Sequence, residues 1–413
     1  MATVTAPAGG GIQTGSRRFP QLDGLRAVAA LSVVATHAGF HTGRSTDAGP
    51  FAPFLARMDF GVTIFFLLSG FLLYRPFVAA ALAGRDGPAV RGFYWRRALR
   101  IFPAYWLATL VTLATVGPYR PSLGDWLRYL TLTHTYVDQR QNVALTQMWT
   151  LVVEVSFYAV LPLLAALTLR PGQPAHVLVR RQALLLAGLA LGTAGWAWVV
   201  RSRAVAGGGR PLLWLPAYLD WFAIGMAFAV ASCALRHPGW PRHGRLRLLD
   251  RAADDTGTCW VIAGLLFWTA TLPLAGPRDL SGLTTWEWFT KHYLYAAAAA
   301  FLLLPAVFGD PDRGVLRAFL ASRPMRFLGE ISYGVYLWHL TLLTVLADVL
   351  GFNLFQGGFA KLYPLTVAAA VTVATASYLA LERPLLALGR SSRVSAEPST
   401  VAASPPSTAA QQN

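Results

Sequence analysis

Charged residues are scarce in this chain of 413 residues, because only 13% are Asp, Glu, Lys or Arg whereas 55% are hydrophobic. A soluble protein of this size needs a larger charged surface, and the polar stretches here are short. The apolar residues instead form runs long enough to cross a bilayer. The composition excludes a soluble fold and predicts an integral membrane protein.

Cysteine is nearly absent, with only Cys233 and Cys259, both in or beside apolar segments. This excludes a disulfide framework, and no spacing of metal ligands occurs, so we expect no metal site. The first nineteen residues also lack an apolar h-region. We therefore expect no cleavable signal peptide, with the first helix acting as its own insertion signal.

Acidic residues are few, since 19 Asp and Glu face 35 Lys and Arg, for a net charge of +16. A nucleic-acid partner is one explanation of this excess. However, the basic residues lie in the loops between apolar runs, and alternate loops hold roughly twice as many as the others. This bias follows the positive-inside rule, so it predicts a cytoplasmic N-terminus and no nucleic-acid partner.

Runs of roughly 17 to 25 apolar residues predict an all-α, polytopic membrane protein with about ten transmembrane helices and both termini in the cytoplasm. The stretch Leu123–Tyr136 is amphipathic and too short to cross, so we expect it to be interfacial or re-entrant. Residues 20–390 form the predicted transmembrane domain, while 1–19 and 391–413 are predicted to be disordered. The expected spans are Leu22–Phe40, Phe60–Gly84, Ile101–Gly117, Trp149–Leu169, Gln182–Val200, Leu212–Leu235, Thr256–Gly276, His292–Gly309, Ile331–Gly351 and Pro364–Leu388.

Two ionisable residues, Arg26 and His37, lie in the first predicted helix. Their spacing is within about 20° of whole helical turns, so they share one face about 16 Å apart along the axis. Ionisable groups in a bilayer are costly and are candidates for function. The alternatives are that Arg26 snorkels to the inner interface and that His37 is a satisfied packing histidine.

Five further segments contain aromatic, arginine or acidic residues in a fixed order: GVTIFFLLSGFLLYRPF (Gly61–Phe77), FYWRRALRIFPAYW (Phe93–Trp106), MWTLVVEVSFY (Met148–Tyr158), ISYGVYLWH (Ile331–His339) and SYLALERP (Ser377–Pro384). Together with the first helix, this ordered set resembles the acyltransferase-3 family of membrane-bound O-acyltransferases. The resemblance implies a bacterial cell-membrane enzyme that acylates surface polysaccharides, peptidoglycan or glycosylated natural products such as macrolides.

A basic cluster, Arg91, Arg96, Arg97 and Arg100, lies at the predicted cytoplasmic entrance of the third span. Guanidinium groups suit phosphate, so this end is expected to bind a polyphosphorylated donor such as acyl-CoA, most simply acetyl-CoA. Simple positive-inside anchoring is the alternative. The resemblance favours Arg97 and Arg100, which with Arg26 would hold the phosphates.

Glu154 and His37 are predicted to reach a similar depth from opposite ends of their helices. A carboxylate facing an imidazole fixes its tautomer and raises its basicity, as a general base requires. The alternatives are a structural polar pair, a role for Glu154 in binding the acceptor hydroxyl, or a role for His37 as acyl carrier.

The remaining candidates are hydroxyls and one further imidazole. Ser69 offers a hydroxyl beside a glycine, although small residues in membrane helices usually serve packing. Tyr333, Tyr336 and His339 recur every three residues and so line one side of a helix, where they are expected to bind donor or acceptor. An aromatic interfacial role is the alternative for Tyr333. Glu382 is expected to pair with a basic residue.

These observations and the resemblance together predict an O-acyltransferase that moves an acyl group from cytoplasmic acyl-CoA to a hydroxyl of a sugar-containing acceptor. A transporter without covalent chemistry also explains many helices with buried ionisable residues, but it predicts inverted repeats, which are not visible. A scaffold that kept the fold without activity is a third alternative, and retention of the arginine, histidine and glutamate candidates argues against it.

Overall fold

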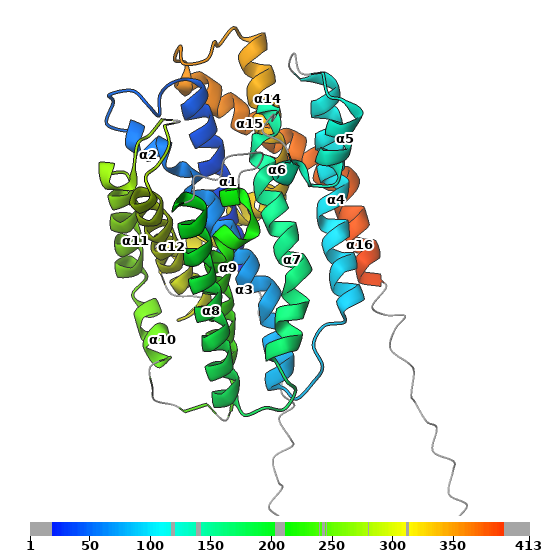
Figure 1. Cartoon of the computed structure of the whole chain (residues 1–413), viewed down its shortest axis with the longest axis vertical. Coiled ribbons are helices and arrows are strands. Elements are labelled where there is room, and N and C mark those ends of the chain that lie inside the picture. The colour runs from blue at the N-terminus through cyan, green and yellow to red at the C-terminus, as the bar shows by residue number, and fades with distance from the viewer. Residues whose placement is uncertain are drawn as a thin grey trace, which may run out of the picture.

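The computed structural model describes residues 19–116, 120–137, 142–202, 211–238, 240–241, 244, 246–279, 281–310 and 314–391, and within them all regular structure is helical (Figure 1). The all-α prediction is confirmed for these residues. Nearly all of the two stretches predicted to be disordered lies outside them. The helices are α1 (Pro20–His41), α2 (Ala52–Ala56), η1 (Met58–Phe60), α3 (Gly61–Leu82), α4 (Val90–Thr115), α5 (Leu123–Leu130), α6 (His134–Val137), η2 (Val143–Met148), α7 (Trp149–Thr168), α8 (Ala175–Ser202), η3 (Pro211–Leu213), η4 (Leu215–Tyr218), α9 (Leu219–Ala234), α10 (Arg247–Asp254), α11 (Thr256–Ala270), η5 (Pro273–Ala275), α12 (Thr285–Val307), α13 (Val315–Leu320), α14 (Arg323–Val349), α15 (Phe359–Ser377), the π-helical turn η6 (Tyr378–Glu382) and α16 (Arg383–Ser391).

Several of these helices are long and apolar enough to span a bilayer, which makes this a multi-pass membrane protein. Each of the predicted spans coincides with a helix, but α11 has only 15 residues, and α1, α12 and α14 carry more polar side chains. The count of about ten and the cytoplasmic termini therefore stay predictions. Within the described residues, 6 segments are both long enough and apolar enough to span a bilayer, namely Ala52–Leu82, Val90–Thr115, Val143–Thr168, Ala175–Ser202, Leu215–Ala234 and Phe359–Leu388.

Four helices begin seven or more residues before the apolar runs that predicted them, and one of these is α8, which begins at Ala175 rather than Gln182. α4 begins at Val90 rather than Ile101, and α14 begins at Arg323 rather than Ile331. α12 begins at Thr285 rather than His292, because Thr284 and Glu287 form a capping box there. Hydropathy detects only the apolar part of a helix, whereas backbone hydrogen bonding continues through polar turns.

The expected amphipathic stretch Leu123–Tyr136 forms two short helices, α5 and α6, of 8 and 4 residues. Neither is long enough to cross a bilayer, as predicted. Ser122 and Asp125 form a capping box at the start of α5, and the α5–α6 segment contacts α4 and α7.

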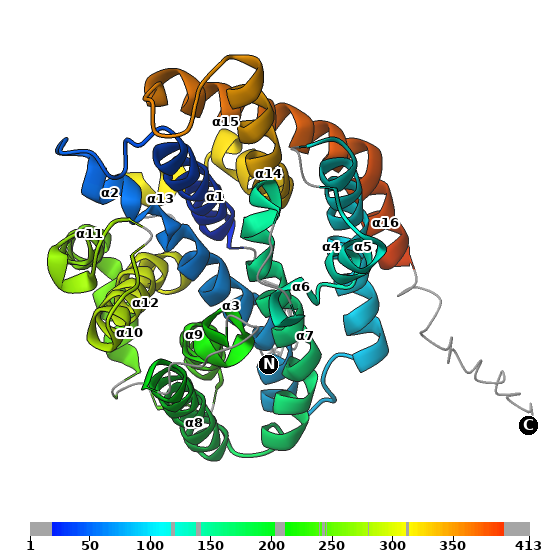
Figure 2. The same cartoon turned by 45° about the horizontal axis from the view of Figure 1, so that its top comes forward.

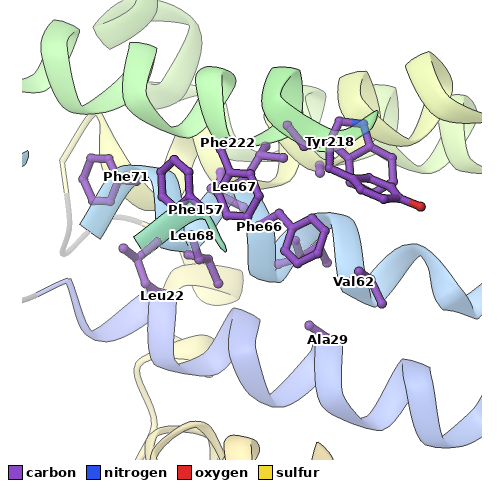
Figure 3. Packing of buried hydrophobic residues seen from close by; sticks show 14 of the residues in the cluster. Leu22, Ala29, Val62, Phe66, Leu67, Leu68, Phe71, Phe157, Tyr218 and Phe222 are labelled. Carbon is purple, nitrogen blue, oxygen red and sulfur yellow. The ribbon is translucent and has the colours of Figure 1, made fainter. Parts of the chain in front are cut away.

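The core is built around α3, which runs through the middle of the bundle beside α1, α7, α9 and α12 (Figure 2). Three stacked phenylalanine rings connect α3 to α7 and α9. Phe157 of α7 stacks on Phe222 of α9 with ring centroids 3.9 Å apart, and Phe222 stacks on Phe66 of α3 at 4.7 Å (Figure 3). Stacked buried rings of this kind bury much apolar area and hold three helices in register.

Glycines allow α3 and α9 to approach each other closely. A Cβ added to Gly70 would collide with the carbonyl oxygen of Phe222, and one added to Gly225 would collide with that of Leu67. Small residues serve such packing in membrane helices. Gly70 therefore has the packing role expected for its motif, which leaves the neighbouring Ser69 side chain free for another contact.

Candidate functional site

A pocket of about 670 Å³ lies among α1, α3, α4, α7 and α14. It contains most of the residues that the sequence singled out, although their motifs are far apart along the chain. We call it the arginine pocket, and it is lined by Arg26, Val62, Phe65, Phe66, Ser69, Arg97, Arg100, Ile101, Thr150, Leu151, Glu154, Tyr158, Ser332, Tyr333 and Tyr336. His37 and His339 are the predicted site residues that do not line it.

Three arginines supply the positive charge of this pocket. Arg100 forms an ion pair with Glu382, at 3.3 Å between Nη1 and Oε2, which confirms the expected pairing of that glutamate. Arg26 and Arg97 have no carboxylate oxygen within 4 Å among the described residues. The Arg97 guanidinium lies over the Tyr158 ring and that of Arg100 over the Tyr333 ring. Two guanidinium groups on the pocket wall are thus available to an anionic ligand.

Glu154 lies on the same wall and is held by two hydroxyl donors. Ser69 donates from α3 to Oε1 at 2.7 Å, and Tyr158 donates to the same oxygen from one turn further along α7. Ser69 thus has a polar contact in addition to the packing role that the sequence favoured. Tyr158 was missed by the sequence reasoning, although its position four residues after Glu154 on one helix face was a usable signal.

His37 contacts His339, whereas the predicted partner of His37 was Glu154. The two imidazoles meet at 3.3 Å between Nδ1 of His37 and Nε2 of His339. His37 Nδ1 also lies 2.8 Å from the carbonyl oxygen of Val33, and His339 Nδ1 lies 2.7 Å from that of Tyr336. The expected His37–Glu154 pair is not formed, because His37 contacts His339 while Glu154 accepts hydrogen bonds from Ser69 and Tyr158.

The carbonyl contacts assign the tautomers of both histidines. Because a carbonyl oxygen only accepts, the Nδ1 atoms of His37 and His339 each carry a proton when the rings are neutral. The single Nδ1–H of His37 is then shared between the Val33 carbonyl oxygen and Nε2 of His339, and Nε2 of His37 holds an unshared electron pair. That atom makes no hydrogen bond within the described residues, and His37 is only half-buried. The arrangement suits a general base.

The tyrosine hydroxyls on α14 are already bonded. Tyr333 donates to the carbonyl of Ile101 at 2.9 Å, and Tyr336 contacts Thr150 at 2.7 Å and the Gln147 carbonyl at 3.0 Å. Both tyrosines therefore reach the arginine pocket through their rings rather than through free hydroxyls. Tyr336 also links the pocket to the histidine pair, since its carbonyl accepts from His339.

Comparison with known proteins finds relatives that are named for O-acetylation or for exopolysaccharide production. The chain is 24% identical to the peptidoglycan O-acetyltransferase OatA of Listeria monocytogenes, over 90% of this chain and 56% of the relative. It is 22% identical to the O-acetyltransferase OatA of Staphylococcus aureus, over 78% of this chain and 50% of the relative. It thus spans about half the length of these two proteins.

A third relative, the exopolysaccharide production protein ExoZ of Rhizobium meliloti, is 28% identical over 81% of this chain and 92% of its own length. No solved structure matches the chain. A family model described as an acyltransferase domain matches residues 19–381. As the order of its motifs predicts, the chain belongs to the acyltransferase-3 family of membrane proteins.

Proposed function

We propose that the protein transfers an acyl group, most simply acetyl, from acyl-CoA to a hydroxyl of a sugar-containing acceptor. The observation that carries the proposal is the arginine pocket, in which Arg26 and Arg97 face the cavity without a carboxylate partner among the described residues. Phosphate groups are the ligands that such planar, fork-shaped donors prefer. Coenzyme A carries several of them.

The donor's phosphates would bind Arg26, Arg97 and Arg100, with the pantetheine arm directed along α1 toward His37. Ser69, Tyr158 and Glu154 would form the wall beside this arm. Tyr336 has its ring on the pocket and its carbonyl on the histidine pair. The thioester would therefore pass this residue on its way to the base.

His37 would act as the general base through Nε2. It would take the proton of the acceptor hydroxyl as the hydroxyl oxygen attacks the thioester carbonyl carbon. The carbon–sulfur bond then breaks, and the imidazolium returns the proton to the departing thiolate, which leaves an ester and free coenzyme A. His339 would position the imidazole in the place that the sequence reasoning gave to Glu154. In the alternative, His37 carries the acyl group itself.

The relatives support a glycan as acceptor. Two are named for O-acetylation, one of them of peptidoglycan, and one for exopolysaccharide production. A surface glycan and a small glycosylated natural product present the same chemistry to the site, namely a sugar hydroxyl. The family membership supports an acyl transfer rather than transport.

The proposal is tested by incubating detergent-purified protein with radiolabelled acetyl-CoA and a panel of glycans and glycosylated macrolides. We expect label to reach an acceptor hydroxyl, and we expect Arg97→Ala to weaken binding of acetyl-CoA. Arg91→Ala is the matched control, because Arg91 lies on the same helix but is exposed and outside the pocket. If acetyl-CoA does not bind the wild-type protein, the donor assignment fails and transport becomes the better explanation.

A further inference from the structure

A second pocket adjoins the arginine pocket and differs from it in chemistry. It has a volume of about 510 Å³ and shares Val62 with the arginine pocket, while Trp149 of its wall directly precedes Thr150 and Leu151 of the other. We call it the tryptophan pocket, and it is lined by Asp59, Val62, Trp149, Tyr218, Trp221, Leu283, Trp288, Lys291, His292 and Tyr295.

Aromatic rings make up most of its wall. The imidazole of His292 is stacked between two indoles, with centroid distances of 4.4 Å to Trp221 and 4.5 Å to Trp288. Trp149 packs on Tyr218 at 5.3 Å on the side near the arginine pocket. Flat aromatic surfaces of this size suit the apolar C–H face of a sugar ring, while the rigidity of the rings limits the entropy lost on binding.

One carboxylate of the pocket lining, Asp59, supplies hydrogen-bond acceptors beside these rings, and a second, Asp220, lies buried outside the lining and holds His292. Asp59 accepts from Lys291 at 2.7 Å and from Tyr295 at 2.6 Å, yet 42% of its side chain stays exposed. Asp220 accepts from His292 at 2.8 Å. Each carboxylate is thus held in place by a donor, and Asp59 has capacity left for a ligand hydroxyl.

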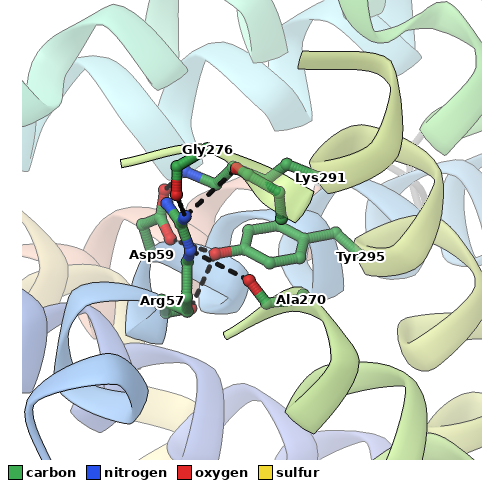
Figure 4. A network of polar contacts seen from close by, with 7 residues as sticks. Arg57, Asp59, Ala270, Gly276, Lys291 and Tyr295 are labelled. Atoms are coloured by element: carbon green, nitrogen blue, oxygen red, sulfur yellow. Dashed lines mark hydrogen bonds and ion pairs between the residues drawn. The ribbon is translucent and has the colours of Figure 1, made fainter. Parts of the chain in front are cut away.

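The position of Asp59 is fixed by a network around Arg57 (Figure 4). The Arg57 guanidinium is buried and donates to the carbonyl oxygens of Ala270, Ala275 and Gly276, which anchors the segment that follows α11. The Arg57 carbonyl in turn accepts from Tyr295 at 3.0 Å. The pocket wall is therefore built by specific buried contacts, as expected of a preformed binding site.

We propose that the tryptophan pocket binds a pyranose ring of the acceptor. This inference rests on the proposed function and names the place where its acceptor is held. Aromatic rings beside charged side chains that are already paired suit an uncharged, polyhydroxylated ligand. Arg26 and Arg97 of the arginine pocket, which have no carboxylate partner among the described residues, instead suit the anionic donor. The η1 turn that carries Asp59 packs on α1, the helix of His37. A sugar in this pocket therefore lies against Val62, at the border of the donor site, and against the η1 turn, which itself packs on the helix of the proposed base.

The inference is tested by isothermal titration of the purified full-length protein with chitotriose, cellotriose and maltotriose, without acyl donor. We expect at least one sugar to bind the wild-type protein. Trp288→Ala and the isosteric Asp59→Asn are each expected to weaken that binding about tenfold or more. Trp286→Ala is the matched control, because Trp286 lies on the same helix but is 71% exposed and does not line the pocket.

Binding of acetyl-CoA to the same variants separates this inference from the proposed function. Both pocket variants are expected to bind acetyl-CoA like the wild type, which also shows that they are folded. If no sugar binds the wild type, or if both pocket variants bind sugar as the control does, the acceptor assignment is overturned even where acyl transfer persists. If the wild type binds a sugar but does not bind acetyl-CoA, the result counts against the proposed function and not against the sugar site.

Discussion

The arginine pocket and the tryptophan pocket meet at Val62 but have opposite character. The first places three guanidinium groups around one cavity and leaves two of them without a carboxylate partner among the described residues. The second surrounds its cavity with indole and phenol rings, and its carboxylate Asp59 already accepts hydrogen bonds. If the proposed function holds, this difference lets one bundle sort its two substrates, since the anionic donor and the neutral sugar would each find complementary chemistry in only one of the pockets.

The sharpest test of this division is His37→Ala, because His37 lines neither pocket. Removal of a general base is expected to lower kcat about 10³-fold and to leave the affinity for acetyl-CoA unchanged. His41→Ala is a suitable control, since that side chain lies one turn further along α1 and contacts the Phe352 carbonyl at 3.1 Å. Steady-state transfer and equilibrium binding of labelled donor would measure the two effects. A loss of donor affinity equal to the loss of kcat would show that His37 belongs to the donor site.

The next largest effect is expected for Arg26→Ala with the complete donor. Loss of a charge-assisted contact to phosphate should weaken acetyl-CoA about 10- to 100-fold. The same variant should bind S-acetylpantetheine, which lacks the nucleotide and its phosphates, as well as the wild type does. Competition binding with both compounds tests this, and an equal loss for the two would place Arg26 away from the phosphates. Binding of chitotriose or its analogues should be unaffected.

A smaller effect is expected for His339→Ala, because in the proposed mechanism this side chain positions His37 and does not itself take the proton of the acceptor. We expect kcat to fall about tenfold, with a shift in the pH–rate profile as the orientation and basicity of His37 change. The donor and acceptor KM values should stay the same. An unchanged pH profile would reduce the role of His339 to packing.

The smallest effect is expected for Glu154→Gln, which keeps the shape of the side chain and an oxygen for Ser69 and Tyr158. Because Glu154 does not contact His37, kcat should fall less than about tenfold, well below the effect of His37→Ala. Transfer assays on the two variants side by side decide the matter. Equal losses of kcat in the two variants would support the direct action of Glu154 on His37 that the sequence suggested.

Much of the architecture follows from the sequence alone. The scarcity of charge and the apolar runs determine a helical membrane protein, because a backbone in lipid must satisfy its own hydrogen bonds. The ordered motifs determine the family, and the arginines, Glu154 and Ser69, which those motifs or the first helix contain, line one pocket. The pairing of Glu382 with a basic residue was also predictable, since a buried carboxylate needs a counter-charge.

Other features depend on how the helices pack. Depth along a helix axis placed His37 and Glu154 at one level, but the rotation of α1 and α14 about their axes brings His37 to His339 instead. The tryptophan pocket joins η1, α9 and α12, segments that contain none of the recognised motifs, so no motif predicted it. Hydrophobic periodicity reports which residues avoid water, whereas the choice of neighbour across a helix interface is made by side-chain shape and close backbone approach.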